Sequence, residues 1–256
     1  MSRKKVWKNQ EIPVKIFLMA MKQFLLNLFF PLYCINCQGE ENYLCQDCFS
    51  LIDIQTFQYC PFCSPAKIVF DGKTCYSCRK NKKLTGLFCA ASYQNFIIKK
   101  LISQFKYEPY VKELAKPLAY LIIQHFQSLD YPSAFFKDRT GFIFVPVPLH
   151  KKRLKWRGFN QAEEIARHLS LCFKIPLISD VLLKTKETRP QMELTAEVRK
   201  ENIKSAFVCQ NKNLIKEKKI LLVDDVFTTG STMEECARVL KNSGAKEVWG
   251  VAVARE

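Results

Sequence analysis

The feature that most constrains this chain is a series of four Cys-x-x-Cys pairs within its first third. Two intervening residues let both thiolates of a tight turn point at one tetrahedral ion, and two such pairs complete a four-sulfur zinc site. We therefore expect two structural zinc ions in a segment too short to build an adequate core of its own. The spacing allows sequential or interleaved combination of the pairs, which are Cys34 with Cys37, Cys45 with Cys48, Cys60 with Cys63, and Cys75 with Cys78.

Two other cysteine chemistries fit the pattern less well. A disulfide framework requires an oxidising compartment, whereas the remaining cysteines are isolated in apolar stretches, as in a reduced cytosolic protein. Iron–sulfur ligands usually show uneven spacing and a nearby proline. We expect the isolated cysteines to be small core residues, and they are Cys89, Cys172, Cys209 and Cys236.

Length and charge set the scale of the fold and the kind of partner. The chain has 256 residues, enough for one domain of about 150–200 residues and a small appendage. Its 48% hydrophobic and 25% charged residues exclude a mostly disordered chain. The net charge of +16 favours an anionic partner, such as a phosphate compound, nucleic acid or acidic lipid.

The N-terminal 30 residues are basic and then apolar, which is also the order in a signal peptide. Lys22, Gln23 and Asn27 interrupt the apolar run, no small-residue cleavage site follows, and Pro31 ends it before about 20 apolar residues have accumulated. We expect an amphipathic helix that packs on the zinc segment or contacts a membrane surface peripherally. Without an export signal, a cytoplasmic location is expected.

From residue 85 onward the pattern becomes that of an α/β protein. Short apolar runs, typical of buried parallel strands, alternate with segments whose apolar residues recur at i, i+3, i+4 and i+7, as on one face of a helix. This alternation predicts a doubly wound parallel sheet. Pro117 is expected to kink its helix or to start a second piece. The expected strands are 87–93, 142–147, 219–223 and 248–254, and the helical segments are centred on 98–105, 111–126, 162–169 and 233–240.

Residues 220–232 combine a strand, two acids, a hydroxyl-rich loop and the start of a helix. In an open parallel sheet, ligands lie beyond the carboxyl ends of the strands, where this loop falls. Loop amides and a helix N-terminus present unpaired N–H groups to an anion, and Gly230 lets the backbone approach closely. The hydroxyl groups that can donate to phosphate oxygens belong to Thr228, Thr229, Ser231 and Thr232.

The two acids of this segment, Asp224 and Asp225, would repel a phosphate, so they suit a different part of the ligand. They can accept hydrogen bonds from a sugar diol or hold Mg²⁺. Phosphate, diol and metal together describe a ribose 5-phosphate ligand.

A strongly basic segment follows the strand expected at 142–147. Five positive charges lie within residues 151–157, where a turn is expected. Arg153 and Arg157 can clamp a pyrophosphate, whereas Trp156 and Phe159 between these cations suit base stacking along single-stranded DNA. Either use, or both, fits the sequence.

These motifs together resemble a known family. Residues 223–232 resemble the phosphoribosyl-pyrophosphate (PRPP) motif of type I phosphoribosyltransferases. Three further stretches are similar to the ComF family, also called GntX-like, and Lys184 departs from it, since the family tends to carry Arg there. These stretches are residues 145–149, residues 153–161, and Thr188-Arg189-Pro190-Gln191 continuing to Arg199, Asn202 and Ala206-Phe207.

The resemblance implies an amphipathic leader (1–33), a double zinc-ribbon module (34–84) and a type I phosphoribosyltransferase-like domain (85–256). It implies a pyrophosphate loop at Val147, Pro148 and Leu149, continued by the basic residues Lys152, Arg153 and Arg157, and a mobile loop near residues 184–191. It also implies a cytoplasmic role in natural transformation, with PRPP and Mg²⁺ as ligands and single-stranded DNA and the transformation machinery as partners. The alternative is an active Mg²⁺-dependent phosphoribosyltransferase of nucleotide salvage, although no catalytic residue or base pocket is identifiable.

Overall fold

Four parallel strands form the central sheet of the protein. The computed structural model describes residues 32–40, 42–70, 72–129, 140–187 and 203–256. Its main sheet has the order β1-β6-β5-β2, formed by β1 (Gly86–Ser92), β6 (Glu247–Arg255), β5 (Lys219–Phe227) and β2 (Phe142–Pro146). The expected α/β class with a parallel sheet is therefore confirmed.

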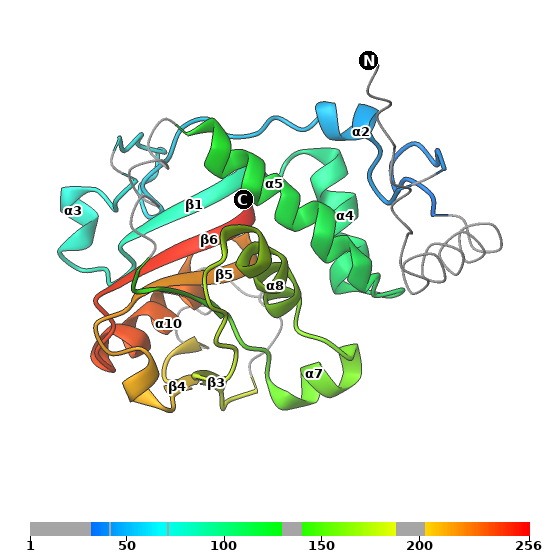
Figure 1. Ribbon diagram of the computed structural model, residues 1–256. Coiled ribbons are helices and arrows are strands. Elements are labelled where there is room, and N and C mark those ends of the chain that lie inside the picture. Colours follow the sequence, from blue (N-terminus) through cyan, green and yellow to red (C-terminus); the bar gives the residue numbers. More distant parts are fainter. Residues whose placement is uncertain (1–31, 41, 71, 130–139, 188–202) are drawn as a thin grey trace, which may run out of the picture.

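Helices cover both faces of this sheet (Figure 1). One face carries α4 (Phe96–Lys106), α5 (Ala115–Ser128) and α8 (Gln161–Phe173), whereas α10 (Ser231–Asn242) packs on the other. Alternate residues of each strand supply the two cores, because successive side chains of a strand point to opposite faces. In β5, Leu221 and Val223 belong to the first core and Ile220 and Leu222 to the second.

A second, two-stranded sheet lies on the α10 side and was not expected from the sequence. It pairs β3 (Leu182–Lys184) with β4 (Phe207–Cys209) in antiparallel register, and a 3₁₀ turn, η3 (Lys212–Leu214), follows β4. Leu182 and Phe207 bury their side chains in the core beneath α10. Strands of three residues are too short to show a hydrophobic period, which is why the pattern gave no signal.

The structure corrects two expected elements and confirms one of two alternatives for a third. The helix expected over 111–126 is divided into a 3₁₀ turn, η1 (Lys112–Leu114), and α5, and Pro117 lies in the first turn of this second piece, where no helical bond requires its N–H. The expected basic turn is the short helix α7 (Lys151–Arg157), which ends at Gly158 with a φ of 84°. Strand β5 continues beyond residue 223 to Phe227, so the two acids lie within the strand.

The cysteine-rich segment attaches to both faces of the sheet. Its two short helices, α2 (Gln46–Ser50) and α3 (Tyr76–Arg79), lie at opposite sides of the view in Figure 1. Ile35 and Ile52, near α2, are buried in the core beneath α4 and α5. Phe62 packs instead against the core beneath α10. The expected leader helix falls almost entirely outside the described residues, and within those residues no helix has the length and apolar character needed to span a membrane.

Candidate functional site

Eight cysteines form two separate groups of four. Cluster 1 consists of Cys34, Cys37, Cys45 and Cys48, and cluster 2 of Cys60, Cys63, Cys75 and Cys78. Consecutive pairs therefore combine, which decides between the sequential and interleaved arrangements. All eight are free thiols, so they are not a disulfide framework.

The geometry of both clusters suits one metal ion each. Within a cluster all four sulfur atoms lie within 4.8 Å of one another. The Sγ atoms of Cys37 and Cys45 are 3.6 Å apart, and those of Cys63 and Cys75 are 3.5 Å apart. Tetrahedral ligation with Zn–S bonds of about 2.3 Å requires S···S distances of about 3.8 Å. Within cluster 2 the backbone N–H of Cys78 lowers the pKa of the Cys75 thiol to about 6, whereas the neighbouring thiols, Cys60 first, raise that of Cys63 to about 12, because the four sulfur atoms interact closely.

The two acids Asp224 and Asp225 lie side by side near the carboxyl end of β5. Asp225 is buried, and its carboxylate accepts a hydrogen bond of 2.6 Å from the backbone N–H of Val226. The Asp224 carboxyl accepts from the N–H of Asp225 at 2.9 Å. Burial, and then the neighbouring Asp225, raise the pKa of Asp224 to about 8. The ionised form of Asp224 is therefore disfavoured in the folded protein.

Lys106, at the last position of α4, neutralises this pair from the other side. Its Nζ atom lies 2.9 Å from Oδ1 of Asp225. Burial disfavours the charge of Lys106, but the carboxyl groups of Asp225 and Asp224 outweigh it and raise the pKa of the amine. Lys106 was not among the site residues expected from the sequence, although its spacing along the helix indicates it. Lys106 continues the i, i+4 series of Ile98 and Ile102, so it places a charge on an otherwise apolar helix face.

The hydroxyl-rich loop follows β5 directly and leads into α10. The Oγ1 atom of Thr229 and the Oγ atom of Ser231 are 2.9 Å apart, so the two side chains lie together. Gly230 has a φ of 73°, and a Cβ atom at this position would collide with the ring of Phe227. Only glycine fits this turn. The structure thus brings the hydroxyl groups of this loop, residues 228–232, next to the two acids.

Three further cations lie near the acids or near one another: Arg157 interacts with Asp225, Lys184 with Asp224, and Arg153 with both of these cations. Arg153 and Arg157 lie one turn apart on α7, and Lys184 ends β3. Burial lowers the pKa of Arg157 and of Lys184, and the charge of Arg153 lowers both further. Arg157 is also close enough to interact with Asp225. Together with Lys106, four cations lie around two carboxyl groups, so the site has a surplus of positive groups and suits an anion.

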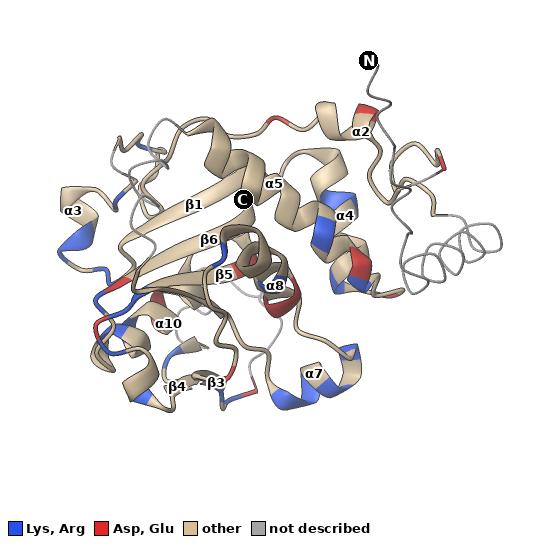
Figure 2. Ribbon diagram, viewed as in Figure 1, with Lys and Arg blue, Asp and Glu red and all other residues tan. Residues whose placement is uncertain are grey.

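The remaining side chains of α7 point away from this site. Lys151, Lys152 and Lys155 are exposed, and Trp156 is 66% exposed with its ring 5.5 Å from that of Tyr110. Lys152 pairs with Glu187 at 2.6 Å. Figure 2 shows Lys and Arg residues along α7, α4 and α3. Helix α7 thus has an inner face of two partly buried arginines and an outer face of exposed lysines, with Trp156 between the two faces, where it packs on Tyr110 as Arg157 does.

The segment between β2 and α7 is held by backbone bonds. The N–H of Val147 donates to the carbonyl of Val223 at 2.9 Å, and the side-chain amide of Asn160 donates to the carbonyl of Val147 at 3.1 Å. Pro148 and Leu149 are partly exposed. These contacts place residues 147–149 beside β5 and close to the two acids. The stretch 188–191, Arg199 and Asn202 lie outside the described residues.

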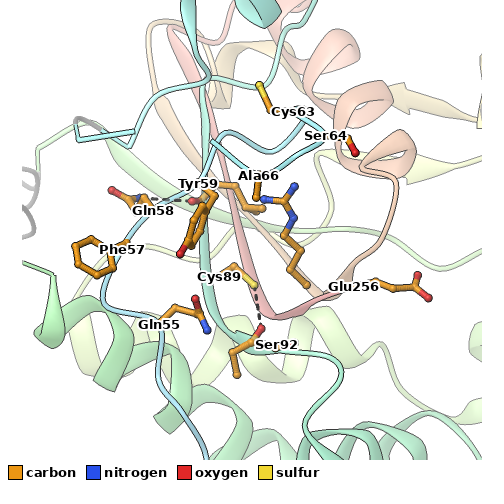
Figure 3. Close-up of a pocket in the computed structure, with 13 residues that line it drawn as sticks. Gln55, Phe57, Gln58, Tyr59, Cys63, Ser64, Ala66, Cys89, Ser92 and Glu256 are labelled. Atoms are coloured by element: carbon orange, nitrogen blue, oxygen red, sulfur yellow. Dashed lines mark hydrogen bonds between the residues drawn. The ribbon is translucent and has the colours of Figure 1, made fainter. Parts of the chain in front are cut away.

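A cavity of about 490 Å³ lies between the cysteine-rich segment and strands β1 and β6 (Figure 3). Its wall consists of residues from the cysteine-rich segment, including Gln55, Phe57 and Tyr59, and of the ends of β1 and β6. Arg255, another wall residue, lies over the ring of Phe227 at 5.9 Å. The sequence did not indicate this cavity, because its wall combines three separate segments that only the fold brings together.

Comparisons with known proteins agree with this architecture. The family model of the phosphoribosyl transferase domain matches residues 155–255. Competence protein F of Haemophilus influenzae is 31% identical over 238 residues, which cover 88% of this chain and 99% of that protein. Competence protein ComFC of Bacillus subtilis is 31% identical over 202 residues, 68% of this chain and 80% of that protein. The chain belongs to the ComF family.

A shorter match links this ComF-family chain to a third relative. DNA utilization protein YhgH of Escherichia coli is 37% identical over 107 residues, which cover 41% of this chain and 46% of that protein. The phosphoribosyl transferase match of the ComF chain begins within α7 and includes β5, the hydroxyl-rich loop and α10. It therefore contains both acids and the loop, but neither cysteine cluster.

Because each cluster offers four thiols, we expect the ComF-family chain to bind about two zinc ions. Cys45→Ser and Cys75→Ser should each lose one ion, since each removes one ligand from a different cluster. Metal analysis after gel filtration, with thiol counting after chelation, measures this. Full retention of zinc in both variants, or one ion per wild-type chain, would contradict the assignment.

Because the pKa of Asp224 is about 8 in the folded protein and about 3.9 in an unfolded chain, the folded state holds this proton more tightly. The carboxyl group therefore lowers the free energy of unfolding as pH rises from about 4 to about 8. We expect the free energy of unfolding of Asp224→Asn, measured relative to that of the wild type, to rise by at least about 1 kcal/mol from pH 5 to pH 8. Urea unfolding at both values measures this, with the exposed Asp180→Asn as control. Equal stability differences at both pH values would contradict the shifted pKa.

Proposed function

We propose that this protein acts in natural transformation, where it handles incoming single-stranded DNA on the cytoplasmic side, and that its loop at residues 228–232 binds PRPP or a related ribose 5-phosphate compound. The observation that carries the ligand proposal is the surplus of positive charge around the two acids. Lys106, Arg153, Arg157 and Lys184 exceed the charge of the acid pair, and a phosphorylated ligand would balance them. The names of the two competence relatives and of the DNA utilization relative support the biological role.

Within this proposal the parts of the ligand have separate partners. The loop hydroxyls and amides, from Thr228 to Thr232, take the 5-phosphate. Asp224 and Asp225 accept from the ribose hydroxyls or hold Mg²⁺. The pyrophosphate lies against Val147, Pro148 and Leu149 and the inner arginines of α7. Zinc in both clusters is structural, and the division into residues 1–33, 34–84 and 85–256 is retained as part of the proposal.

The two faces of α7 also give the basic segment two separate roles. Arg157 interacts with Asp225 and Arg153 lies one turn before it, whereas Lys151, Lys155 and Trp156 are exposed. Exposed cations with an aromatic ring are typical of surfaces that bind single-stranded DNA through phosphates and base stacking. We assign DNA to the outer face and pyrophosphate to the inner face.

The second candidate is an active Mg²⁺-dependent phosphoribosyltransferase. The cavity bounded by Gln55, Tyr59 and Ser92 favours it, because an acceptor base requires a pocket next to the ribose. Release of pyrophosphate and a nucleotide product from PRPP and a mixture of nitrogen bases would support this candidate. Membership of the family does not by itself establish turnover.

Removing the negative charges tests the ligand site. Asp224→Asn combined with Asp225→Asn is expected to weaken PRPP binding at least about 100-fold, because the carboxyl groups that accept from the ribose hydroxyls and hold Mg²⁺ are lost. Calorimetry in Mg²⁺ buffer measures the affinity, and circular dichroism checks the fold. The exposed Asp180→Asn is the matched control. Unchanged affinity of the double variant would remove the site from these residues.

Separating the two faces of α7 tests the dual role. Arg153→Ala with Arg157→Ala is expected to weaken the binding of PRPP more than that of ribose 5-phosphate, because only PRPP carries pyrophosphate. Lys151→Ala with Lys155→Ala should instead weaken the binding of single-stranded DNA. The salt dependence of that binding should fall by about 0.7 log unit per decade of salt for each lost phosphate contact. Equal loss of PRPP and ribose 5-phosphate in the arginine variant would move the arginines to the DNA surface.

A further inference from the structure

Phe62 connects cluster 2 to the hydroxyl-rich loop. This residue lies between two ligands of the cluster, Cys60 and Cys63. Its ring packs edge-on against that of Phe227, the last residue of β5, at a centroid distance of 6.4 Å. Its Cε1 atom lies only 3.1 Å from the place that a Cβ atom on Gly230 would occupy. Phe62 thus covers both the beginning and the middle of the loop.

Polar contacts fix the same segment on either side of Phe62. The guanidinium of Arg255 donates to the carbonyls of Cys60 and Pro61 at 3.2 and 3.3 Å, and it lies over the ring of Phe227. Glu234, in the first turn of α10, accepts from the backbone N–H groups of Lys83 and Leu84 at 2.8 and 3.1 Å. Cluster 2 is therefore attached to β6, to the loop and to the helix after it.

Cluster 1 has the same ligands but different neighbours. The ring of Phe49, directly after Cys48, packs against Tyr120 of α5 at 5.2 Å. The carbonyl of Leu51 accepts from the side chain of Asn95, which caps α4. These contacts belong to the face of the sheet opposite α10. The two clusters thus form a natural comparison within one chain.

We propose that the metal in cluster 2 holds the phosphate-binding loop in its folded geometry through Phe62, and that cluster 1 has no such role. Ligation fixes the four-residue turn from Cys60 to Cys63, and a small metal-bound segment loses its fold when the metal leaves. Without that turn, Phe227 and Gly230 lose their cover and Arg255 loses two acceptors. Metal binding at cluster 2 and phosphate binding at the loop are then coupled, and the coupling is reciprocal. This reciprocal part rests on the ribose-phosphate site proposed above.

The first test needs no ligand. Cys45 and Cys75 each precede a short helix as its N-cap, and serine also caps helices well, so Cys45→Ser and Cys75→Ser are matched variants. Hydrogen exchange of the peptide that covers residues 227–233 is expected to be on the order of tenfold faster in Cys75→Ser than in the wild type, and unchanged in Cys45→Ser. Peptides from β2 check that the core has remained folded. Unchanged exchange in Cys75→Ser, or equal acceleration in both variants, would overturn the proposal.

The second test keeps the metal and removes only the contact. Phe62→Ala is expected to retain both metal ions and to accelerate hydrogen exchange of the same peptide. It should weaken Mg²⁺–PRPP binding roughly threefold to tenfold, which corresponds to the typical contribution of an aromatic pair. Phe49→Ala, beside cluster 1, should change neither. Conversely, PRPP should slow chelator extraction of zinc from Cys45→Ser, which keeps cluster 2, but not from Cys75→Ser.

Hydrogen exchange of the loop and affinity for PRPP distinguish the proposed role of cluster 2 from the proposed ligand. If the wild type binds no PRPP, the proposed ligand is wrong, and the exchange data alone still decide whether cluster 2 orders the loop. If PRPP binds but Phe62→Ala leaves both its affinity and the loop exchange unchanged, the ligand proposal stands and the role of Phe62 is wrong.

Discussion

Parallel pairing of β5 with β2 on one side and β6 on the other brings the carboxyl ends of three strands to one edge of the sheet. Everything assigned to the candidate site depends on this constraint, because the acids, the hydroxyl-rich loop and the segment before α7 each follow or end one of these strands. The same edge receives Lys106 from the end of α4 and Arg255 from the end of β6. Helices on both faces bury the sheet, so the site is built on a rigid base.

Electrostatics then distinguishes this edge from an ordinary loop region. Burial makes Asp224 difficult to ionise, and Lys106 offsets Asp225, so the acids do not repel a phosphate as two exposed carboxylates would. Burial, and then the charge of Arg153, lower the pKa of Arg157 and of Lys184. A cluster of cations whose charged forms are disfavoured in this way fits an anion-binding site better than a structural salt bridge.

Sequence patterns predicted the parallel sheet and the location of its main elements, because buried strands and amphipathic helices have clear hydrophobic periods. They also identified both cysteine clusters, although only the fold showed which pairs combine. Contacts between distant segments could not be predicted. Phe62 and Gly230 are far apart in the chain, and the cavity wall joins three segments that are also far apart. The β3–β4 pair and the helical form of α7 were missed because such short elements are decided by tertiary contacts rather than by periodicity.

The most direct test of the account is a calorimetric titration of PRPP with Mg²⁺, repeated in the presence of saturating single-stranded DNA. The account predicts binding of about one PRPP per chain, as expected for one phosphate loop, with a lower affinity when DNA is bound, because DNA phosphates on the outer face of α7 repel the pyrophosphate on its inner face. Absence of binding under both conditions would contradict the central claim, since the loop would then be a scaffold without a ligand. Binding that DNA leaves unchanged would contradict the placement of DNA on α7.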